Sequence, residues 1–436
     1  MEIETLRTKL LAAVPDYMAE IAPGPLIRRY LEKNPAPPLP AGPKALLSLG
    51  KAAGAMTATL ADTFDVAPAH TLSILPEGYP PPPPSYPLFW GSHPLPDRRS
   101  LEAFERLREF IHTLPDERLL VVALSGGSSS LVVQPLPPVG LEDKVSLSKR
   151  LIESGAPIET VNALRIHLSS FKGGGLARMI GSRPSLTYIL SDIPGDGASL
   201  VGSSPMFSVL RDGPGMLSAL ELWLGDTIPE PVRRLLLSLP SLPPPPPASQ
   251  ALFGGVLASS KTLISAMQKI FLPIAPLSGL PLHILSEELC GEAREVGRVL
   301  ASQIRWHAPT HPEGALWAAS GETTVTLSQG SPGRGGRTQE LALSLALSLS
   351  KTSALVLSLA SDGSDGNSGL AGALLPSAPF CNPRLAHEGQ EALSRHDSGE
   401  FLERHGWGIR TGPSGTNLND LLMVVYPPSS PPRSPL

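Results

Sequence analysis

The sequence is poor in cysteine, with only Cys290 and Cys381 among 436 residues. Two cysteines are too few for a zinc cluster or a disulfide framework, so we expect ordinary buried thiols. Long hydrophobic runs are also missing, and no stretch of about 18 apolar residues predicts a membrane span. The first residues carry acidic side chains and no long apolar core, unlike a secretory signal. We therefore expect a soluble cytoplasmic protein.

A basic field is absent as well. The net charge is −4, and no run of like charges stands out, which argues against a nucleic-acid partner. Proline, in contrast, is abundant, with 50 prolines beside six tyrosines. Part of this proline lies in two runs, at 80–84 and 243–247, which are typical of semi-rigid extended spacers.

The length predicts more than one domain. A chain of 436 residues exceeds a single hydrophobic core, and at roughly 150 residues per domain it predicts two or three domains, of which we choose two. A proline-rich stretch marks the boundary. We expect an N-terminal domain at 1–242, a linker at 243–249, a C-terminal domain at 250–426 and a disordered tail at 427–436.

Apolar runs of strand length alternate with helical patterns in both halves, which predicts an α/β fold. A helix over 2–31 opens the chain, and we expect it to pack on the first domain. The predicted strands lie at 45–49, 70–75, 118–124, 185–192, 252–258, 283–285, 324–327, 353–360 and 421–426.

Two loops that follow predicted strands of the first half suit an anion. The turn at Gly50 places Lys51 at the carboxyl end of a strand, where open α/β sheets bind ligands, although a solvated lysine would give the same pattern. No Walker A spacing occurs. The strand at 118–124 leads into a loop of backbone N–H groups and hydroxyls, for which a plain tight turn is the alternative. The loop consists of Ser125, Gly126, Gly127, Ser128, Ser129 and Ser130.

Further polar candidates follow in the first half. Lys172 joins Asn162 and Arg165 beside three glycines, as a basic rim or as part of a solvated helix face. Asp192 ends a strand and can hold Mg²⁺ through water, accept a proton from a substrate hydroxyl, or simply cap the next helix. His93, in a proline-rich loop, either contacts substrate or holds the loop by one hydrogen bond.

The second half repeats the pattern. A loop with four glycines, the last of them Gly336, contains Arg334 and ends at Arg337. The forked guanidinium groups of arginines bind phosphate or carboxylate. A surface turn with two solvated arginines would look the same. Asp362 and Asp365, after the strand at 353–360, suit a metal or a nucleotide, or are ordinary turn residues.

In this order the loops resemble the glycerate 2-kinase family, whose members join an N-terminal glycerate kinase domain to a C-terminal MOFRL domain and often carry the label hydroxypyruvate reductase. The matching segments span nearly the whole chain. They are Leu49-Gly-Lys-Ala-Ala53, 91–97, 124–130, 162–176, Leu190-Ser-Asp-Ile-Pro-Gly-Asp196, 291–294, 321–326, Gly333-Arg-Gly-Gly-Arg337, 360–366 and 411–417.

The sequence departs from the family pattern at a few positions. Ser320 stands where the family usually has a glycine, and Thr338 replaces a common asparagine. Ser203-Ser204-Pro205 replaces a loop that usually carries glycine before its proline. Gly197 stands in place of the second member of an aspartate pair, so it cannot supply a carboxylate. These changes put loop geometry in doubt more than the type of reaction.

The resemblance implies a Rossmann-like N-terminal parallel sheet flanked by helices, a C-terminal α/β MOFRL-type domain and an active site in the cleft between them. It also implies transfer of the γ-phosphoryl group of ATP to the 2-hydroxyl of D-glycerate, which gives 2-phosphoglycerate and ADP, with Mg²⁺ as cofactor. The expected partners are these small molecules, and a homo-oligomer is left open.

Phosphoryl transfer needs positioning and cations more than covalent help from the protein. The resemblance points to Lys51 and an arginine of the glycine-rich loop as the main transition-state cations, and we choose Arg337, with Arg334 as its alternate. The Ser125 to Ser130 loop and Lys172 would bind an anionic group of nucleotide or substrate. Asp192 would accept the proton or bind Mg²⁺. Glu322 and Asp362 are further metal or nucleotide candidates.

Two other interpretations stay open. A hydroxypyruvate reductase that uses a nicotinamide cofactor would need a dinucleotide fold, but no G-x-G-x-x-G follows a strand with an acid about 20 residues later. A sugar-acid or nucleotide sensor that has lost turnover is the non-enzymatic alternative, because several loop residues depart from the family pattern.

Overall fold

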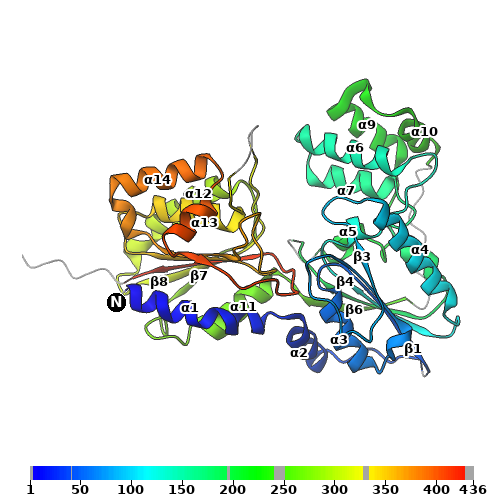
Figure 1. Ribbon diagram of the computed structural model, residues 1–436, viewed down its shortest axis with the longest axis horizontal. Helices are drawn as coiled ribbons and strands as arrows, with labels where there is room; N and C mark the ends of the chain where they lie inside the picture. Colours follow the sequence, from blue (N-terminus) through cyan, green and yellow to red (C-terminus); the bar gives the residue numbers. More distant parts are fainter. Residues whose placement is uncertain (1–2, 41, 194–196, 240–250, 328–332, 428–436) are drawn as a thin grey trace, which may run out of the picture. The chain divides into compact units, whose positions relative to one another are not determined.

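The computed structural model describes residues 3–40, 42–193, 197–239, 251–327 and 333–427 (Figure 1). The chain divides into two compact units. We call the unit built from 27–191 and 197–257 the N-unit, and the unit built from Met1–Leu26, Asp192–Asp196 and Ala258–Leu436 the C-unit. The predicted linker at 243–249 and most of the predicted tail lie outside the described residues.

The N-unit is organised around a six-stranded sheet with the order β3-β2-β1-β4-β5-β6. The strands from β3 to β5 pair in parallel, and β1, β2, β4 and β5 are almost wholly buried, as expected for a sheet covered on both faces. The Rossmann-like parallel sheet is thus confirmed. The bounds are β1 Lys44–Leu49, β2 Thr71–Pro76, β3 Leu88–Gly91, β4 Leu119–Leu124, β5 Ser185–Leu190 and β6 Ala251–Ala258.

One strand corrects the expected domain boundary. The strand predicted at 252–258 was expected to open the C-terminal domain, but β6 forms the edge of the N-unit sheet beside β5. The phenol of Tyr30 donates to Gly254 O at 3.0 Å and holds this strand on the N-unit. An apolar strand at an open sheet edge gains ladder hydrogen bonds there, and a proline-rich stretch before it does not prevent this pairing.

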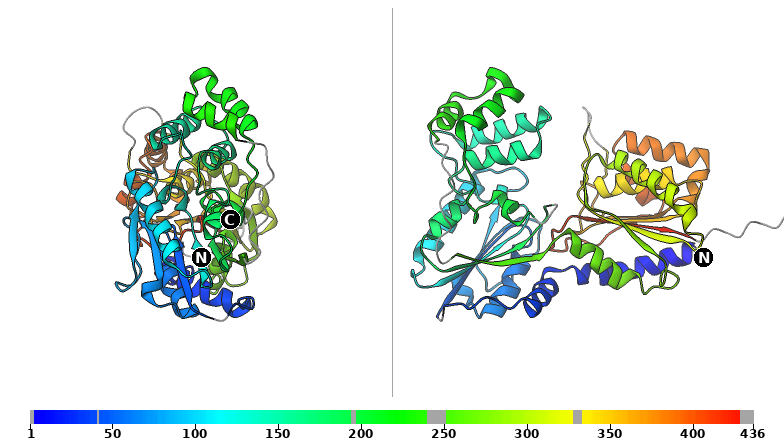
Figure 2. Two further views of the ribbon diagram at one scale, coloured as in Figure 1. Left: turned by 90° about the vertical axis from the view of Figure 1, so that its right-hand side faces the viewer. Right: turned by 180° about the vertical axis from the view of Figure 1, so that it is seen from behind.

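Helices cover the N-unit sheet, and others form a layer of their own (Figure 2). Helix α3 packs on β1 and β2, whereas α4 packs on β3. Four helices, α6, α7, α9 and α10, share a separate apolar core that includes Leu147, Leu164, Leu220 and Val232. The bounds are α3 Ala53–Phe64, α4 Arg98–Thr113, α5 Ser128–Leu131, α6 Leu141–Glu153, α7 Ile158–His167, α8 Gly175–Ile180, α9 Gly213–Leu224 and α10 Glu230–Ser238.

The C-unit contains a second six-stranded sheet with the order β11-β10-β9-β12-β8-β7. Its neighbours pair antiparallel except β7 and β8, which are parallel, so the sheet is mixed. The bounds are β7 Leu282–Leu289, β8 Ala315–Gly321, β9 Leu355–Ala360, β10 Gly372–Pro376, β11 Gly408–Ile409 and β12 Asp420–Tyr426. This α/β arrangement confirms the expected class of the second domain.

The strand predicted at 324–327 is wrong. The strand of this region is β8, Ala315–Gly321, which is wholly buried, and Thr324 forms only an isolated bridge with Glu292. Alternation of threonine with apolar residues favours a strand, but a strand also needs partners on its edges. The apolar run around Trp317 pairs on both sides, with β7 and with β12, and the chain has already left the sheet at Thr324.

Helices lie on both faces of the C-unit sheet (Figure 1). Helices α12, α13, α14 and α15 cover one face, and α1 and α11 cover the other. The bounds are α1 Ile3–Glu20, α2 Pro23–Lys33, α11 Ser260–Phe271, α12 Ala293–His307, α13 Arg337–Ser348, α14 Pro383–Ser394 and α15 Ser398–Arg404.

The opening helix corrects two expectations. The pattern at 2–31 forms two helices, α1 and α2, because Pro23 lacks the N–H that would continue the first helix and is favoured at the start of the second. Helix α1 also packs on the C-unit, not on the first domain. Tyr17 stacks on Phe271 with ring centroids 5.3 Å apart, and Thr416 Oγ1 donates to Ile21 O at 2.8 Å. The apolar stripe of α1 thereby covers a sheet face that α11 alone leaves open.

Both cysteines are exposed, which corrects the expectation of buried thiols. Cys290 follows the end of β7, and Cys381 ends a short 3₁₀ helix, where its Sγ donates to Ser350 O at 2.7 Å. Turn positions at the ends of elements offer little core volume, whatever the usual preference of cysteine.

A close approach at Gly50 generates a prediction. Gly50 has φ +119°, and a Cβ there would lie 2.2 Å from Ser125 Oγ and 2.5 Å from Ser125 O. We predict that Gly50→Ala lowers the free energy of unfolding by more than about 3 kcal/mol in urea titrations. Gly155→Ala is the matched control, because Gly155 also has positive φ, +81°, but no atom within 4 Å, and it should lose about 1 kcal/mol. Equal losses in the free energy of unfolding for the two variants would show that the close approach of Gly50 to Ser125 does not affect stability.

Candidate functional site

The loops that follow β1 and β4 meet in the N-unit. Lys51 N donates to Gly126 O at 2.9 Å, and Ser125 N donates to Leu49 O at 2.9 Å. The Ser125 hydroxyl accepts from Ala52 N at 3.1 Å. In the order 3-2-1-4-5 the direction of winding changes between β1 and β4, and doubly wound sheets bind ligands at the carboxyl ends of the strands beside such a switch point. Two loops far apart in sequence thus form one edge.

The residues of the Ser125 to Ser130 loop have different surroundings. Ser125 holds the two loops together. Ser128 is buried against Gly202, and a Cβ on Gly202 would lie 2.3 Å from Ser128 Oγ. Gly127, Ser129 and Ser130 instead line a pocket. Helix α5 after the loop has only four residues, so the expected contribution of a helix dipole is small.

The pocket beside this loop, about 530 Å³, has four basic side chains and three serines among a largely apolar lining, and we call it the basic pocket. Its cations are Lys144, Lys149, Arg165 and Lys172. The complete lining is His93, Pro94, Leu95, Pro96, Gly127, Ser129, Ser130, Val133, Lys144, Val145, Ser148, Lys149, Ile152, Glu153, Arg165 and Lys172.

Lys51 and His93 meet over Gly127. A Cβ at Gly127 would lie 3.2 Å from Lys51 Cγ and 3.1 Å from His93 Cδ2, which is a tight fit, and the φ of +84° also favours glycine at this position. Lys51 Nζ lies 5.6 Å from the centroid of the Tyr79 ring, a cation–π distance. Lys51 therefore stands beside the wall of the basic pocket.

Lys172 is 1% exposed, so the solvated helix face offered for it as an alternative is wrong. Its Nζ donates to Ser129 O, and burial, with the charges of Lys144 and Arg165, lowers its pKa well below the ordinary value. Lys144 is 3% exposed, and its Nζ donates to Arg165 O at 3.1 Å. Burial, with the charges of Arg165 and Arg211, lowers the pKa of Lys144 to about 7.

Lys144 was not singled out from the sequence, although its position in the chain carries a signal. Lys144, Leu147 and Leu151 are the buried residues of α6, at the spacing of one helix face. A lysine in the apolar stripe of an amphipathic helix is a buried charge, and buried charges are rare unless they are paired or functional.

Arg337 in the C-unit is paired with two carboxylates. Its Nε donates to Asp420 Oδ2 at 2.7 Å and its Nη2 to Asp420 Oδ1 at 3.1 Å, a bidentate pair, while Nη1 lies 2.9 Å from Glu322 Oε1. Burial raises the pKa of Asp420, and the charge of Arg337 opposes that shift. Asp420 was not singled out from the sequence.

Arg337 and Glu322 line a pocket of about 510 Å³, which we call the Arg337 pocket. Its lining is Glu322, Thr323, Thr324, Val325, Leu327, Gly333, Gly335, Gly336, Arg337, Glu340, Asp365, Gly366, Asn367 and His396. Asp365 is fully buried, accepts from Gln339 N at 3.0 Å, and has its pKa raised by burial. Glu340 and His396 form a buried pair at 2.9 Å, and neither was singled out from the sequence.

Arg334 has a different role from Arg337. Its guanidinium lies 3.0 Å from Glu400, 3.3 Å from Glu403, and donates to Ser368 O at 3.1 Å. Arg334 is absent from the lining of the Arg337 pocket. It ties the glycine-rich loop to α15, and its half-exposed ion pairs are of the kind that contributes little energy.

Two predicted aspartates lie outside the Arg337 pocket. Asp192 Oδ2 accepts from Asn417 Nδ2 at 2.6 Å, a hydrogen bond within the C-unit. Asp362 Oδ1 accepts from Ser364 N at 3.1 Å, the geometry of the ordinary turn considered above. Among the described residues, no group of three or more His, Cys, Asp or Glu side chains is placed to hold a metal ion. Asp196 lies outside those residues.

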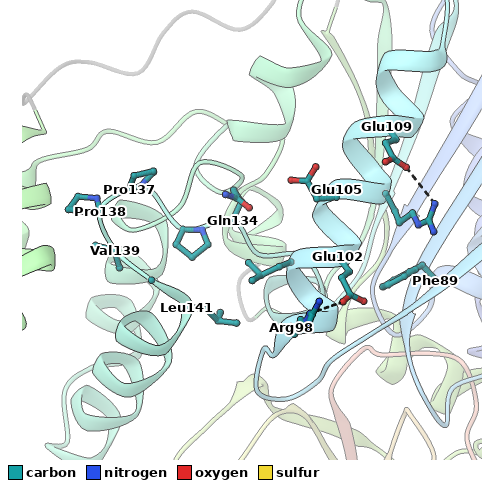
Figure 3. A pocket seen from close by; sticks show the side chains of 14 residues that line it. Phe89, Arg98, Glu102, Glu105, Glu109, Gln134, Pro137, Pro138, Val139 and Leu141 are labelled. Carbon is teal, nitrogen blue, oxygen red and sulfur yellow. Dashed lines mark ion pairs between the residues drawn. The ribbon is translucent and has the colours of Figure 1, made fainter.

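A larger pocket, about 630 Å³, lies along α4 and the segment from Gln134 to Leu141 (Figure 3). Four of its five charged side chains, all on α4, pair with one another, Arg98 with Glu102 at 3.2 Å and Arg106 with Glu109 at 3.5 Å (Figure 3). None of the residues predicted for the site lines it. Acids outnumber bases in the lining, so this pocket does not suit an anionic substrate.

The described residues offer no helix long and apolar enough to cross a membrane.

The doubly wound sheet of the N-unit and the mixed sheet of the C-unit define a two-unit α/β protein. The switch point of the first sheet suits an anionic ligand. Comparison with protein families refines this class. A family model described as a domain of unknown function, DUF4147, matches residues 9–237, and the MOFRL family model matches residues 315–420. The chain therefore belongs to the glycerate 2-kinase family, which confirms the resemblance of its loops.

Individual relatives cover most of the chain. An Agrobacterium vitis protein with the provisional name hydroxypyruvate reductase is 33% identical over 407 residues, 90% of this chain and 89% of the relative. The D-glycerate 2-kinase of Thermotoga maritima is 31% identical over 344 residues, 77% of this chain and 79% of the relative. A crystal structure of glycerate kinase from Thermotoga maritima matches with a TM-score of 0.79 and 27% identity, over 97% of this chain and 100% of that one.

The contrast between the two arginines generates a prediction. Arg337→Ala would leave Asp420, 7% exposed, without its bidentate partner, so we predict a loss of about 3 to 5 kcal/mol in the free energy of unfolding of the C-unit. Arg334→Ala, the matched control from the same loop, should lose less than about 1 kcal/mol. Urea titrations followed by circular dichroism measure both losses. If Arg334→Ala proves the more damaging variant, the assignment of the two arginines is reversed.

Proposed function

We propose that the protein is a glycerate 2-kinase that transfers the γ-phosphoryl group of ATP to the 2-hydroxyl of D-glycerate. One observation carries the proposal: Lys51 and the Ser125 to Ser130 loop meet at the switch point of the N-unit sheet, beside the basic pocket. Sites that transfer phosphoryl groups need this combination of cations and backbone N–H groups around an anion. Relatives named glycerate kinases, alike over most of the chain, support the choice of substrate.

The chemistry balances without a covalent intermediate on the protein. The 2-hydroxyl oxygen of glycerate forms a bond to the γ-phosphorus, the bond from that phosphorus to the β–γ bridging oxygen breaks, and ADP leaves with the electron pair. Asp192 takes the hydroxyl proton in this proposal. Lys51 is the proposed cation that stabilises the charge of the transferring group, and Gly127, Ser129, Ser130 and Lys172 bind an anionic group of the substrates. Arg337 stays the candidate cation of the C-unit.

Arg337 is preferred to Arg334 because it lines a pocket and is aimed by two carboxylates. Glu322 and Asp420 orient the guanidinium in this proposal, so Glu322 acts on the arginine and not on a metal. Asp362 is the least favoured candidate, because its carboxylate closes a turn.

The described residues suit Mg²⁺ only as an ion that is already bound to the phosphates of a nucleotide. The described residues form no cage of three acidic or histidine ligands, but Mg²⁺ on ATP needs one or two carboxylates and otherwise water. Asp192, half-buried shortly after β5, offers one carboxylate, as the alternative to its role as proton acceptor. Bound with ATP, the ion would neutralise negative charge on the phosphates.

The reductase alternative finds less support. A nicotinamide dinucleotide would need a G-x-G-x-x-G turn after a strand at the switch point, for close approach of the backbone to its pyrophosphate. The turn after β1 is Gly50-Lys-Ala-Ala-Gly54, and the turn after β4 is Ser125-Gly-Gly-Ser-Ser-Ser130. Neither has the required spacing.

The decisive assay mixes the protein with D-glycerate, ATP and Mg²⁺, measures ADP release, and identifies the product by ³¹P NMR. We expect ADP formation that depends on glycerate, and a proton-coupled doublet from a phosphate on the secondary carbon. A triplet would instead place the phosphate on the 3-hydroxyl and overturn the regiochemistry. No ADP, with hydroxypyruvate-dependent loss of NADH, would establish the reductase, and neither activity would favour a sensor.

A variant tests the leading cation. We predict that Lys51→Ala lowers kcat by at least about 100-fold, the usual effect of removing a preorganised charge-stabilising group, without unfolding the protein. Lys44→Ala is the matched control, because Lys44 begins β1 at the opposite end of the same strand, and its kcat should stay within about twofold. A folded Lys51→Ala enzyme with full activity would remove this residue from the mechanism.

A further inference from the structure

The basic pocket contains charges that the N-unit itself does not neutralise. Among the described residues, no carboxylate forms an ion pair with Lys144, Arg165 or Lys172. Arg165 Nη1 reaches only the amide oxygen of Asn162, at 3.4 Å. The acid of the pocket lining, Glu153, is exposed and lies 3.7 Å from Lys149.

The two buried ammonium groups are also short of hydrogen-bond acceptors. Each ammonium has three N–H donors, yet Lys144 Nζ has one acceptor, Arg165 O, and Lys172 Nζ has one, Ser129 O. A buried charge with unused donors is costly, and proteins keep such groups where a partner of opposite charge completes them. Both lysines line the pocket, so an anion that enters it can supply that partner.

The surrounding charges point the same way. Lys144 on α6 faces Arg165 on α7 and also Arg211, and Lys172 faces Lys144 and Arg165. Burial and the like charges lower the pKa values of both lysines, so repulsion disfavours their charged forms while the pocket holds no anion. An entering anion would relieve that repulsion.

We propose that Lys144, Lys172 and Arg165 form a subsite of the basic pocket that binds a phosphoryl group. A carboxylate brings one negative charge, whereas phosphoryl groups bring up to two each, which matches three cations better. Lysine also serves as a point-charge partner of phosphate in other proteins. The inference deepens the proposed function, and it rests on that function for the source of the group, either the nucleotide or the phosphorylated acid.

The neighbouring loop supports this assignment. Ser129 and Ser130 line the same pocket as the three cations, and Ser129 O holds Lys172 in place. The Lys51 side chain also approaches Gly127 of this loop, where a Cβ would lie 3.2 Å from Lys51 Cγ. A phosphoryl group at the subsite would therefore lie close to the switch-point loop and to Lys51.

The test uses equilibrium binding, so it is independent of turnover. Isothermal titration calorimetry compares inorganic tripolyphosphate, ATP, 2-phosphoglycerate and D-glycerate on the full chain and on Lys144→Met. We expect Lys144→Met to weaken tripolyphosphate about 10- to 100-fold, the effect of losing a charge-assisted hydrogen bond, and to leave D-glycerate within about threefold. A matching loss for ATP identifies the nucleotide as the source, and a matching loss for 2-phosphoglycerate alone identifies the acid.

Lys149→Met is the matched control, because it removes the same charge from the same helix at an exposed position of the pocket. Its affinity for tripolyphosphate should stay within about threefold. Lys144→Met should melt no lower than the parent, because an apolar side chain replaces an unneutralised buried charge. If it does not fold, Lys144→Gln makes the same test and keeps an N–H donor.

Two outcomes would overturn the inference. A loss of affinity for D-glycerate as large as that for tripolyphosphate would assign the subsite to a carboxylate. Unchanged affinity for all four ligands would show that Lys144 has only a structural role. Failure of the kinase proposal is distinguishable from both, because it appears as absent ADP formation while tripolyphosphate still binds in a manner that depends on Lys144.

Discussion

The hydrogen bonds between the turns after β1 and β4 are the constraint on which the N-unit site depends. Ser125 N bonds to Leu49 O, and Lys51 N bonds to Gly126 O, so the two turns form one rigid edge. Gly50 makes this approach possible, because a side chain there would collide with Ser125. Since backbone groups at the end of a parallel sheet are otherwise unpaired, the same bonds satisfy the strand ends and aim Lys51 at Gly127.

The two units treat buried charge in opposite ways. In the C-unit, Arg337 has its charge matched by Asp420 and Glu322, and a paired guanidinium of this kind keeps one orientation. In the N-unit, Lys144 and Lys172 bond only to backbone carbonyls, which accept hydrogen bonds but carry no charge. The first arrangement is complete without a ligand, whereas the second becomes electrically complete only when an anion enters.

Much of the fold followed from local pattern, because buried parallel strands are continuous apolar runs that end in glycine-rich turns, as at 118–124. The pairing of β6 with the N-unit and the docking of α1 on the C-unit did not follow, because both depend on which exposed apolar edge or face is available after folding. In the same way, sequence order identified Lys51 and Arg337 as candidates but did not reveal Asp420, which meets Arg337 across 83 residues of chain. Lys144 could have been found from its place in an apolar helix stripe.

The departures from the family pattern gain a physical meaning near Lys172. Ser203 and Ser204 adopt φ of 62° and 61°, a left-handed conformation that costs non-glycine residues roughly 1 kcal/mol or more each. Their carbonyl oxygens accept from Gly173 N at 3.1 Å and Gly174 N at 2.7 Å, directly after Lys172. The strained serines thus hold the backbone that carries a buried lysine. A glycine in place of either serine would relax the strain but would also loosen the support of this backbone. Serine at these positions therefore lowers local stability and fixes the position of Lys172.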